Sequence, residues 1–287
     1  MNVVKIEATT LEDAWFRALF EMIENGRVFK IDQGSYAGQK RLEFDYVVVE
    51  IKDPGNKEQS YLPDSNRLLP RIPEQYGMPN PVADDYLDDY LPYLMTDLVS
   101  NNESYTYGQR INKVPLHYDY VFRRKDYLGG HITDEECLVY TDACWDDRSI
   151  VPLEFDFHGN EMYFLSQVNW VIWTYKNKGH RNNQMVLQVA QPTDIVLKDP
   201  PCLRHIDTRV QDNKLHFFPY FRSWDLWNGF PANLAAIQLL KEYMAAEIGV
   251  EDGEMVCASK GLHIYDYTFD MAKCVRMKEE GFMFEGE

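Results

Sequence analysis

The thiol of Cys202 is the group in this 287-residue sequence that is best placed to act as a nucleophile. The Pro200-Pro201 pair restricts the backbone ahead of it, and strand-forming residues follow at 203–210. A nucleophilic cysteine needs positive charge nearby to lower its pKa. A second strand-forming run at 215–222 follows after a short polar turn, so a hairpin brings Arg222 back beside Cys202. In the ordinary alternative, Cys202 is a small buried hydrophobic residue and Arg222 a surface residue at a strand end.

Polar residues set among bulky aromatic side chains follow this predicted hairpin. Arg222 together with Ser223 suits a phosphate group. Asn233 stands near the start of a predicted helix, where it is either a binding amide or an N-cap. His263 and Tyr265 alternate on a predicted strand and so point to one face, as an ordinary half-exposed pair also does. The pattern favours a phosphate site close to the thiol.

The elements that must position these residues are helices and strands in mixed order. Helices are predicted from a Thr9–Glu12 capping box to Gly26, at 84–99, at 168–176 and at 232–248, and strands at 42–51, 185–191, 203–210, 215–222 and 262–267. Residues 53–83 are rich in proline, which predicts a long surface segment, and an insertion is predicted at about 112–165. Since no linker divides the chain and no strict βαβ order exists, we predict one α+β domain over residues 1–287.

The composition restricts the classes of partner. With 29 Lys and Arg against 46 Asp and Glu, the net charge is -17, which disfavours nucleic acid and anionic membranes. No apolar run is long enough for a membrane-spanning helix, and no secretory signal is apparent. The five cysteines are odd in number and far apart, which indicates reduced thiols in the cytoplasm.

Several motifs in this order resemble the thymidylate synthase family. They are Pro-Pro-Cys at 200–202, Arg-Ser-x-Asp-x-x-x-Gly-x-Pro-x-Asn at 222–233 and His-Ile-Tyr at 263–265, and their separations match as well. Tyr-Gly-Gln-Arg at 107–110 and the opening helix with Ala14-Trp15 are similar to the archaeal-type branch. The resemblance is strong over 183–267, weak over 1–52 and 84–111, and absent over 112–165.

This resemblance implies a fold and an activity. The fold is a mixed twisted sheet with helices packed on one face and the sheet of a second protomer on the other. The activity is that of a methyltransferase, the reductive methylation of dUMP to dTMP. The co-substrate 5,10-methylenetetrahydrofolate supplies both the carbon and the hydride, and no metal is expected. The protein is expected to be a cytoplasmic homodimer without membrane or nucleic-acid partners.

The resemblance also implies the reactive residues. Cys202 adds to C6 of the pyrimidine, which makes C5 a carbon nucleophile. Tyr107 lies near the thiol and its water network. Asp225 bonds the pterin of the folate, and Asn233 reads the edge of the base. Asp89 stands where the family carries a catalytic glutamate, and its ordinary alternative is a solvated helix face.

The residues implied to hold the sugar and phosphate include departures from the family pattern. Arg222 and Ser223 bind the phosphate, Arg222 also favours the Cys202 thiolate, and His263 and Tyr265 bind the deoxyribose 3′-hydroxyl. Where the family has two arginines that reach the partner's phosphate site, this chain has Asn183 and Gln184, and Arg181 is the substitute. An early phosphate-loop arginine is replaced by Gln33, with Arg41 as the substitute, and the C-terminal segment 281–287 lacks the usual apolar tail.

Two other readings remain open. A hydroxymethylase acting on dUMP or dCMP has the same fold and adds water in place of the hydride. A non-catalytic nucleotide- or RNA-binding relative is disfavoured by Cys202 with Arg222 and by the net charge of -17. The carboxamide of Asn233 matches uracil better than cytosine, although a flipped amide accepts cytosine. An unpaired buried polar group costs about 1–3 kcal/mol, so we expect dUMP to be preferred by roughly tenfold to a hundredfold.

Overall fold

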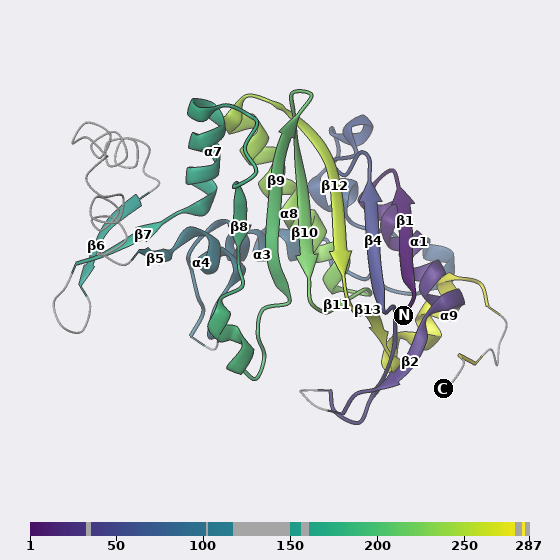
Figure 1. Ribbon diagram of the computed structural model, residues 1–287. Helices are drawn as coiled ribbons and strands as arrows, with labels where there is room; N and C mark the ends of the chain where they lie inside the picture. Colours follow the sequence, from purple (N-terminus) through teal and green to yellow (C-terminus); the bar gives the residue numbers. More distant parts are fainter. Residues whose placement is uncertain (33–35, 102, 117–149, 156–160, 279–282, 285–287) are drawn as a thin grey trace.

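A computed structural model describes residues 1–32, 36–101, 103–116, 150–155, 161–278 and 283–284 (Figure 1). At its centre is a six-stranded mixed sheet in the order β1-β4-β12-β10-β9-β8. The strands are β1 (Val3–Ala8), β4 (Tyr46–Ile51), β12 (Glu251–Ser259), β10 (Lys214–Phe221), β9 (Leu203–Gln211) and β8 (Val186–Gln188). The pairs β1–β4 and β12–β10 are parallel and the other neighbouring pairs are antiparallel.

Helices cover one face of this sheet, as Figure 1 shows. The central one is α8 (Gly229–Ile248), which is buried along most of its length and contacts β10 and β12. It packs against α1 (Leu11–Asn25), α3 (Tyr86–Met95) and α7 (Gln167–Lys178). The buried strand residues, such as Leu215, Phe217 and Met255, alternate with outward residues, so the core lies between sheet and helices. The chain therefore has the predicted α+β architecture.

Two smaller sheets flank the central one. The first has the order β11-β13-β3-β2 and is formed by β11 (Trp224–Asp225), β13 (Leu262–Tyr265), β3 (Lys40–Glu43) and β2 (Arg27–Lys30). The second is antiparallel, in the order β5-β7-β6, and is formed by β5 (Val114–Leu116), β7 (Glu161–Leu165) and β6 (Ile150–Phe155). The greater part of the predicted insertion at 112–165 lies outside the described residues.

Short elements complete the described chain. They are η1 (Lys57–Gln59), α2 (Asp64–Leu68), η2 (Glu74–Tyr76), α4 (Tyr107–Asn112), η3 (Pro192–Val196), η4 (Asp266–Thr268) and α9 (Phe269–Val275). No helix in the described part of the chain is long and apolar enough to cross a membrane.

Several predicted elements are confirmed, and others shift. The hairpin of β9 and β10 closes at Asp212 and Asn213, which both have the positive φ of such turns. The first helix does end at Gly26, but its N-cap is Thr10, whose side chain accepts a hydrogen bond from the N–H of Asp13. The predicted capping box was therefore wrong by one residue. Glu12 instead accepts a hydrogen bond at 3.1 Å from the backbone N–H of Arg71.

Two predictions based on runs of similar residues were wrong. The single strand at 42–51 is two strands in different sheets, because Phe44 is buried and its N–H bonds to Leu262 where the chain changes direction. The segment at 53–83 is not confined to the surface. It buries apolar side chains of the core, namely Leu68, Leu69, Ile72 and Val82.

Candidate functional site

The two ends of the β9–β10 hairpin meet at the thiol. Cys202 directly precedes β9, and Arg222 directly follows β10. The backbone N–H of Arg222 donates to the carbonyl oxygen of Cys202 at 2.9 Å. The sequence-based expectation that the hairpin returns Arg222 to the side of Cys202 is therefore confirmed.

The side chain of Arg222 folds over the residues ahead of the thiol. Its guanidinium donates to the carbonyl oxygens of Pro200 at 2.5 Å and Pro201 at 3.2 Å, and it pairs with Asp199 at 3.4 Å. Partial burial raises the pKa of Cys202, while the charge of Arg222 acts in the opposite direction. Burial dominates, so the thiol is protonated at neutral pH, and Arg222 reduces the cost of forming the thiolate.

Three tyrosines surround the thiol on the side of α3 and α4. The hydroxyl of Tyr107 accepts a hydrogen bond at 3.3 Å from the N–H of Leu203, the residue after Cys202. Burial raises the pKa of Tyr107, of Tyr90 and of Tyr105, the last to about 12, so all three hydroxyls are neutral and able to donate protons in hydrogen bonds. Tyr107 thus lies near the thiol, as expected.

The close contact of α3 with α4 depends on Gly108. A Cβ atom there would collide with the backbone carbonyl oxygens of Tyr93, Leu94 and Thr96 at the end of α3. Glycine therefore lets α4 approach α3 closely enough to place Tyr107 at the start of β9.

Asn233 lies in the second turn of α8 and is not an N-cap, since α8 begins at Gly229. Its carboxamide nitrogen donates to the hydroxyl of Tyr90 at 2.7 Å. Its carboxamide oxygen accepts from the indole N–H of Trp224 at 3.0 Å. The amide is therefore held in one orientation between α3 and β11.

The carboxylate of Asp225 accepts hydrogen bonds from backbone N–H groups just before and at the start of α8. Its oxygens accept the backbone N–H groups of Trp227, Asn228 and Gly229, each at 3.1 Å. Three N–H donors use three of about four acceptor positions on a carboxylate, which leaves capacity for one more donor. Asp225 thus positions the loop as well as presenting an oxygen.

His263 and Tyr265 lie on the same side of β13, as predicted, with ring centroids 4.7 Å apart. Burial lowers the pKa of His263, so the ring is neutral. Its Nδ1 lies 2.8 Å from the carbonyl oxygen of Gly261, which makes Nδ1 the protonated nitrogen. Nε2 is buried and has no hydrogen-bond partner among the described residues. Nε2 is therefore able to accept a hydrogen bond from a hydroxyl group.

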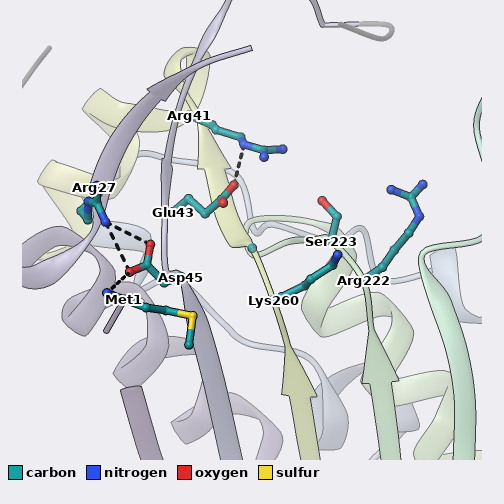
Figure 2. A pocket seen from close by; sticks show the side chains of 9 residues that line it. Met1, Arg27, Arg41, Glu43, Asp45, Arg222, Ser223 and Lys260 are labelled. Carbon is teal, nitrogen blue, oxygen red and sulfur yellow. Dashed lines mark hydrogen bonds and ion pairs between the residues drawn. The ribbon is translucent and has the colours of Figure 1, made fainter. Parts of the chain in front are cut away.

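Arg222 and Ser223 also line an open cavity of about 630 Å³ (Figure 2). Figure 2 shows Arg41 and Lys260 around the same space, from β3 and from the turn after β12. The other charged side chains on its wall are Arg27, Glu43 and Asp45. Arg41 pairs with Glu43 at 2.5 Å, and Arg27 with Asp45 at 3.2 Å. The cavity has a cationic rim on the side of Arg222, which suits an anion.

Two predicted site residues are not brought to this cluster. Asp89 lies on the exposed side of α3, while the next residue, Tyr90, contacts Asn233. Arg181 is exposed in the segment between α7 and β8. Gln33 and most of the C-terminal segment at 281–287 lie outside the described residues.

The site residues expected from the sequence do not include Tyr90, Tyr105, Trp224 and Lys260. The position of Trp224 inside the 222–233 motif was a usable signal. No comparable signal marked Tyr90 or Lys260.

Within the described residues, no group of three or more His, Cys, Asp or Glu side chains is arranged to hold a metal ion. The donors gathered here are a thiol, an imidazole, a carboxamide, tyrosine hydroxyls and guanidinium groups. They suit covalent addition by a thiol to a bound organic anion.

Comparison with known proteins agrees with this fold and indicates a family. The sequence profile described as thymidylate synthase matches residues 118–281. A protein named "Putative thymidylate synthase" from Methanosarcina barkeri is 24% identical over 93% of this chain and 92% of its own length. One of the same name from Methanothermobacter thermautotrophicus is 22% identical over 93% of this chain and 96% of its own. Thermostable thymidylate synthase A from Bacillus subtilis has a similar fold, with a TM-score of 0.56 at 16% identity, over 94% of this chain and 85% of that one.

The match to this family implies an enzyme of the methyltransferase type. The chain belongs to the thymidylate synthase family. The profile match begins at residue 118 and so also covers much of 112–165, where the motifs alone had found no resemblance.

Proposed function

We propose that this protein is a thymidylate synthase that converts dUMP to dTMP, with 5,10-methylenetetrahydrofolate as co-substrate. The observation that carries the proposal is the pairing of Cys202 with Arg222 at the hairpin ends, through the 2.9 Å backbone hydrogen bond. The thiol is half-buried, and a guanidinium that favours its thiolate lies next to it. This is the arrangement that addition of sulfur to C6 of the pyrimidine requires.

Cys202 acts as the nucleophile and Asp225 as a folate ligand in the proposed reaction. The Cys202 thiolate adds its sulfur to C6, so that electron density moves to C5, which forms a bond to the one-carbon unit. C5 then loses its proton as the bond from that carbon to the folate nitrogen breaks. When the hydride reaches the same carbon, the C6–S bond breaks and Cys202 leaves as thiolate. The bound folate supplies the carbon and a hydride and becomes dihydrofolate, which balances the reduction of that carbon to a methyl group. The free acceptor position of Asp225 fits an N–H donor of the pterin.

The rest of the nucleotide has a matching set of contacts. The unpartnered Nε2 of His263 and the hydroxyl of Tyr265 suit the deoxyribose 3′-hydroxyl. The cavity lined by Arg222 and Ser223 suits the phosphate, with Arg41 in the role of the missing loop arginine. Arg181 is proposed to reach the phosphate of the other protomer in a cytoplasmic homodimer. Asp89 is exposed, which supports the ordinary reading of a solvated helix face.

The test is incubation of the protein with dUMP and 5,10-methylenetetrahydrofolate. The dihydrofolate absorbance and the mass of the nucleotide are followed together. We expect dihydrofolate and dTMP in equal amounts. A hydroxymethylated nucleotide without dihydrofolate would support the hydroxymethylase alternative. Bound but unchanged dUMP would instead indicate a non-catalytic relative.

A further inference from the structure

The carboxamide of Asn233 offers only part of its hydrogen-bonding capacity to a ligand. A carboxamide has two acceptor positions on oxygen and two N–H groups. Trp224 uses one acceptor position, at 3.0 Å, and Tyr90 accepts one N–H, at 2.7 Å. One acceptor and one donor therefore remain, which is the pair that uracil requires at N3–H and O4. Cytosine presents the opposite pair.

Of the two neighbours, only Trp224 can fix which way the amide points. An indole N–H donates and cannot accept, so it requires the carboxamide oxygen opposite it. Turning the amide by half a turn would place its NH₂ group against the indole N–H and leave both donors unpaired. The hydroxyl of Tyr90 can donate or accept, so it would adapt to either orientation.

Packing holds the indole of Trp224 in place. The side chain is 2% exposed. Its ring stacks on that of Phe221, with the ring centroids 3.9 Å apart and an angle of 6° between the ring planes. The centroid of the Phe230 ring lies 4.6 Å from that of Trp224. Because Phe221 ends β10 and Phe230 begins α8, the orientation of the N–H is set by the hairpin and the helix that form the site.

We propose that Trp224 determines base specificity by locking the Asn233 amide in the orientation that matches uracil. This inference rests on the proposed function and adds a positioning residue to it, since Trp224 acts through Asn233. Without the lock, the amide of Asn233 flips to meet cytosine at little cost. With it, accepting cytosine leaves buried donors unpaired, a loss of roughly tenfold to a hundredfold in affinity.

The experiment measures dissociation constants of dUMP and dCMP by calorimetry, independently of turnover. Wild type is expected to prefer dUMP by at least about tenfold. Trp224→Phe keeps the stacking and removes the N–H, and it is expected to bring the two constants within about threefold, chiefly by tighter dCMP binding. Tyr90→Phe is the matched control, since it removes the other hydrogen bond of the amide and should retain most of the preference.

A double-variant comparison separates the lock from a general packing effect. In Asn233→Asp the two oxygens are equivalent, so no orientation exists for Trp224 to select. In that background Trp224→Phe should leave the ratio of the two dissociation constants unchanged, whereas a packing defect would act in both backgrounds.

The outcomes distinguish the inference from the function it rests on. An unchanged dUMP preference in Trp224→Phe overturns the lock and leaves the function intact. If Tyr90→Phe loses the preference for dUMP over dCMP, the lock by Trp224 is also overturned. This result can be obtained even if the Trp224→Phe variant does not fold. If wild type binds neither nucleotide, the proposed function fails and the inference with it.

Discussion

Cys202 lies half-buried beside Arg222, so its substitution separates binding from chemistry. Cys202→Ala should lower turnover of dUMP by at least about a thousandfold, because no nucleophile remains to add to C6. The affinity for dUMP should change little, since sugar, base and phosphate contacts remain. Steady-state kinetics and calorimetry measure the two effects. Cys274→Ala, at an exposed free cysteine, is the control. Turnover of Cys202→Ala within tenfold of wild type would refute the mechanism.

The ionisation of Cys202 gives a second prediction at this scale. Burial raises the pKa of the thiol, Arg222 lowers it and Asp199 raises it. Alkylation of Cys202 by iodoacetamide, followed by mass spectrometry of its peptide, should therefore accelerate with pH around a midpoint above that of an ordinary thiol. Arg222→Met should move the midpoint up, and Asp199→Asn should move it down. A shift of both variants in the same direction would contradict this electrostatic account.

At the scale of elements, the contact between α3 and α4 positions Tyr107. In Gly108→Ala, the added methyl group meets three backbone carbonyl oxygens, so the two helices must separate. We expect a loss of about 1–3 kcal/mol in the free energy of unfolding, as for other overpacked sites, together with a lower kcat as Tyr107 moves from Leu203. Denaturant unfolding and kinetics measure the two effects.

Gly229→Ala is the matched control for this prediction. Its Cβ would have only ordinary contacts, with the nearest atom of Asp225 at 3.4 Å, and its backbone N–H to Asp225 is kept. Equal losses of stability in the two variants would show that the α3–α4 contact is not special.

At the scale of the whole molecule, the helices among the described residues cover one face of the central sheet and leave its other face open, as Figure 1 shows. Phe218 and Tyr220 on β10 and Tyr46 and Val48 on β4 point to this face, opposite the buried residues of the same strands. Apolar surface of this kind favours a symmetric partner. We expect light scattering to give a dimer, and Phe218→Glu to give a monomer with reduced turnover.

The controls for the dimer lie away from this face. Tyr61→Glu changes a side chain that is 79% exposed in the 53–83 segment, and it should leave the dimer intact. Arg181→Ala should keep the dimer and weaken dUMP binding, if Arg181 reaches the partner's phosphate site. A monomeric wild type at micromolar concentration would contradict the dimer, and unchanged dUMP affinity in Arg181→Ala would contradict the contact in trans.

The sequence alone determined the local framework of this site. The turn residues Asp212 and Asn213 set the register of the hairpin, so the distance along the chain already implies that Arg222 returns to within one residue of Cys202. A shift of register after Tyr220 then brings the two residues opposite each other. The alternation along 262–265 likewise puts His263 beside Tyr265. These relations depend on short-range geometry, which residue type and spacing specify.

Only the tertiary structure decided which neighbouring side chain faces the site from each element. Asp89 and Tyr90 are adjacent on α3 and therefore point about 100° apart, so the packing of α3 on α8 selects Tyr90. The break between β3 and β4 likewise carries Arg41 into the sheet that borders the Arg222 cavity. Both outcomes depend on contacts between elements far apart in the chain. Local propensity and periodicity cannot predict such contacts, because the contacts form only when the elements pack together in the core.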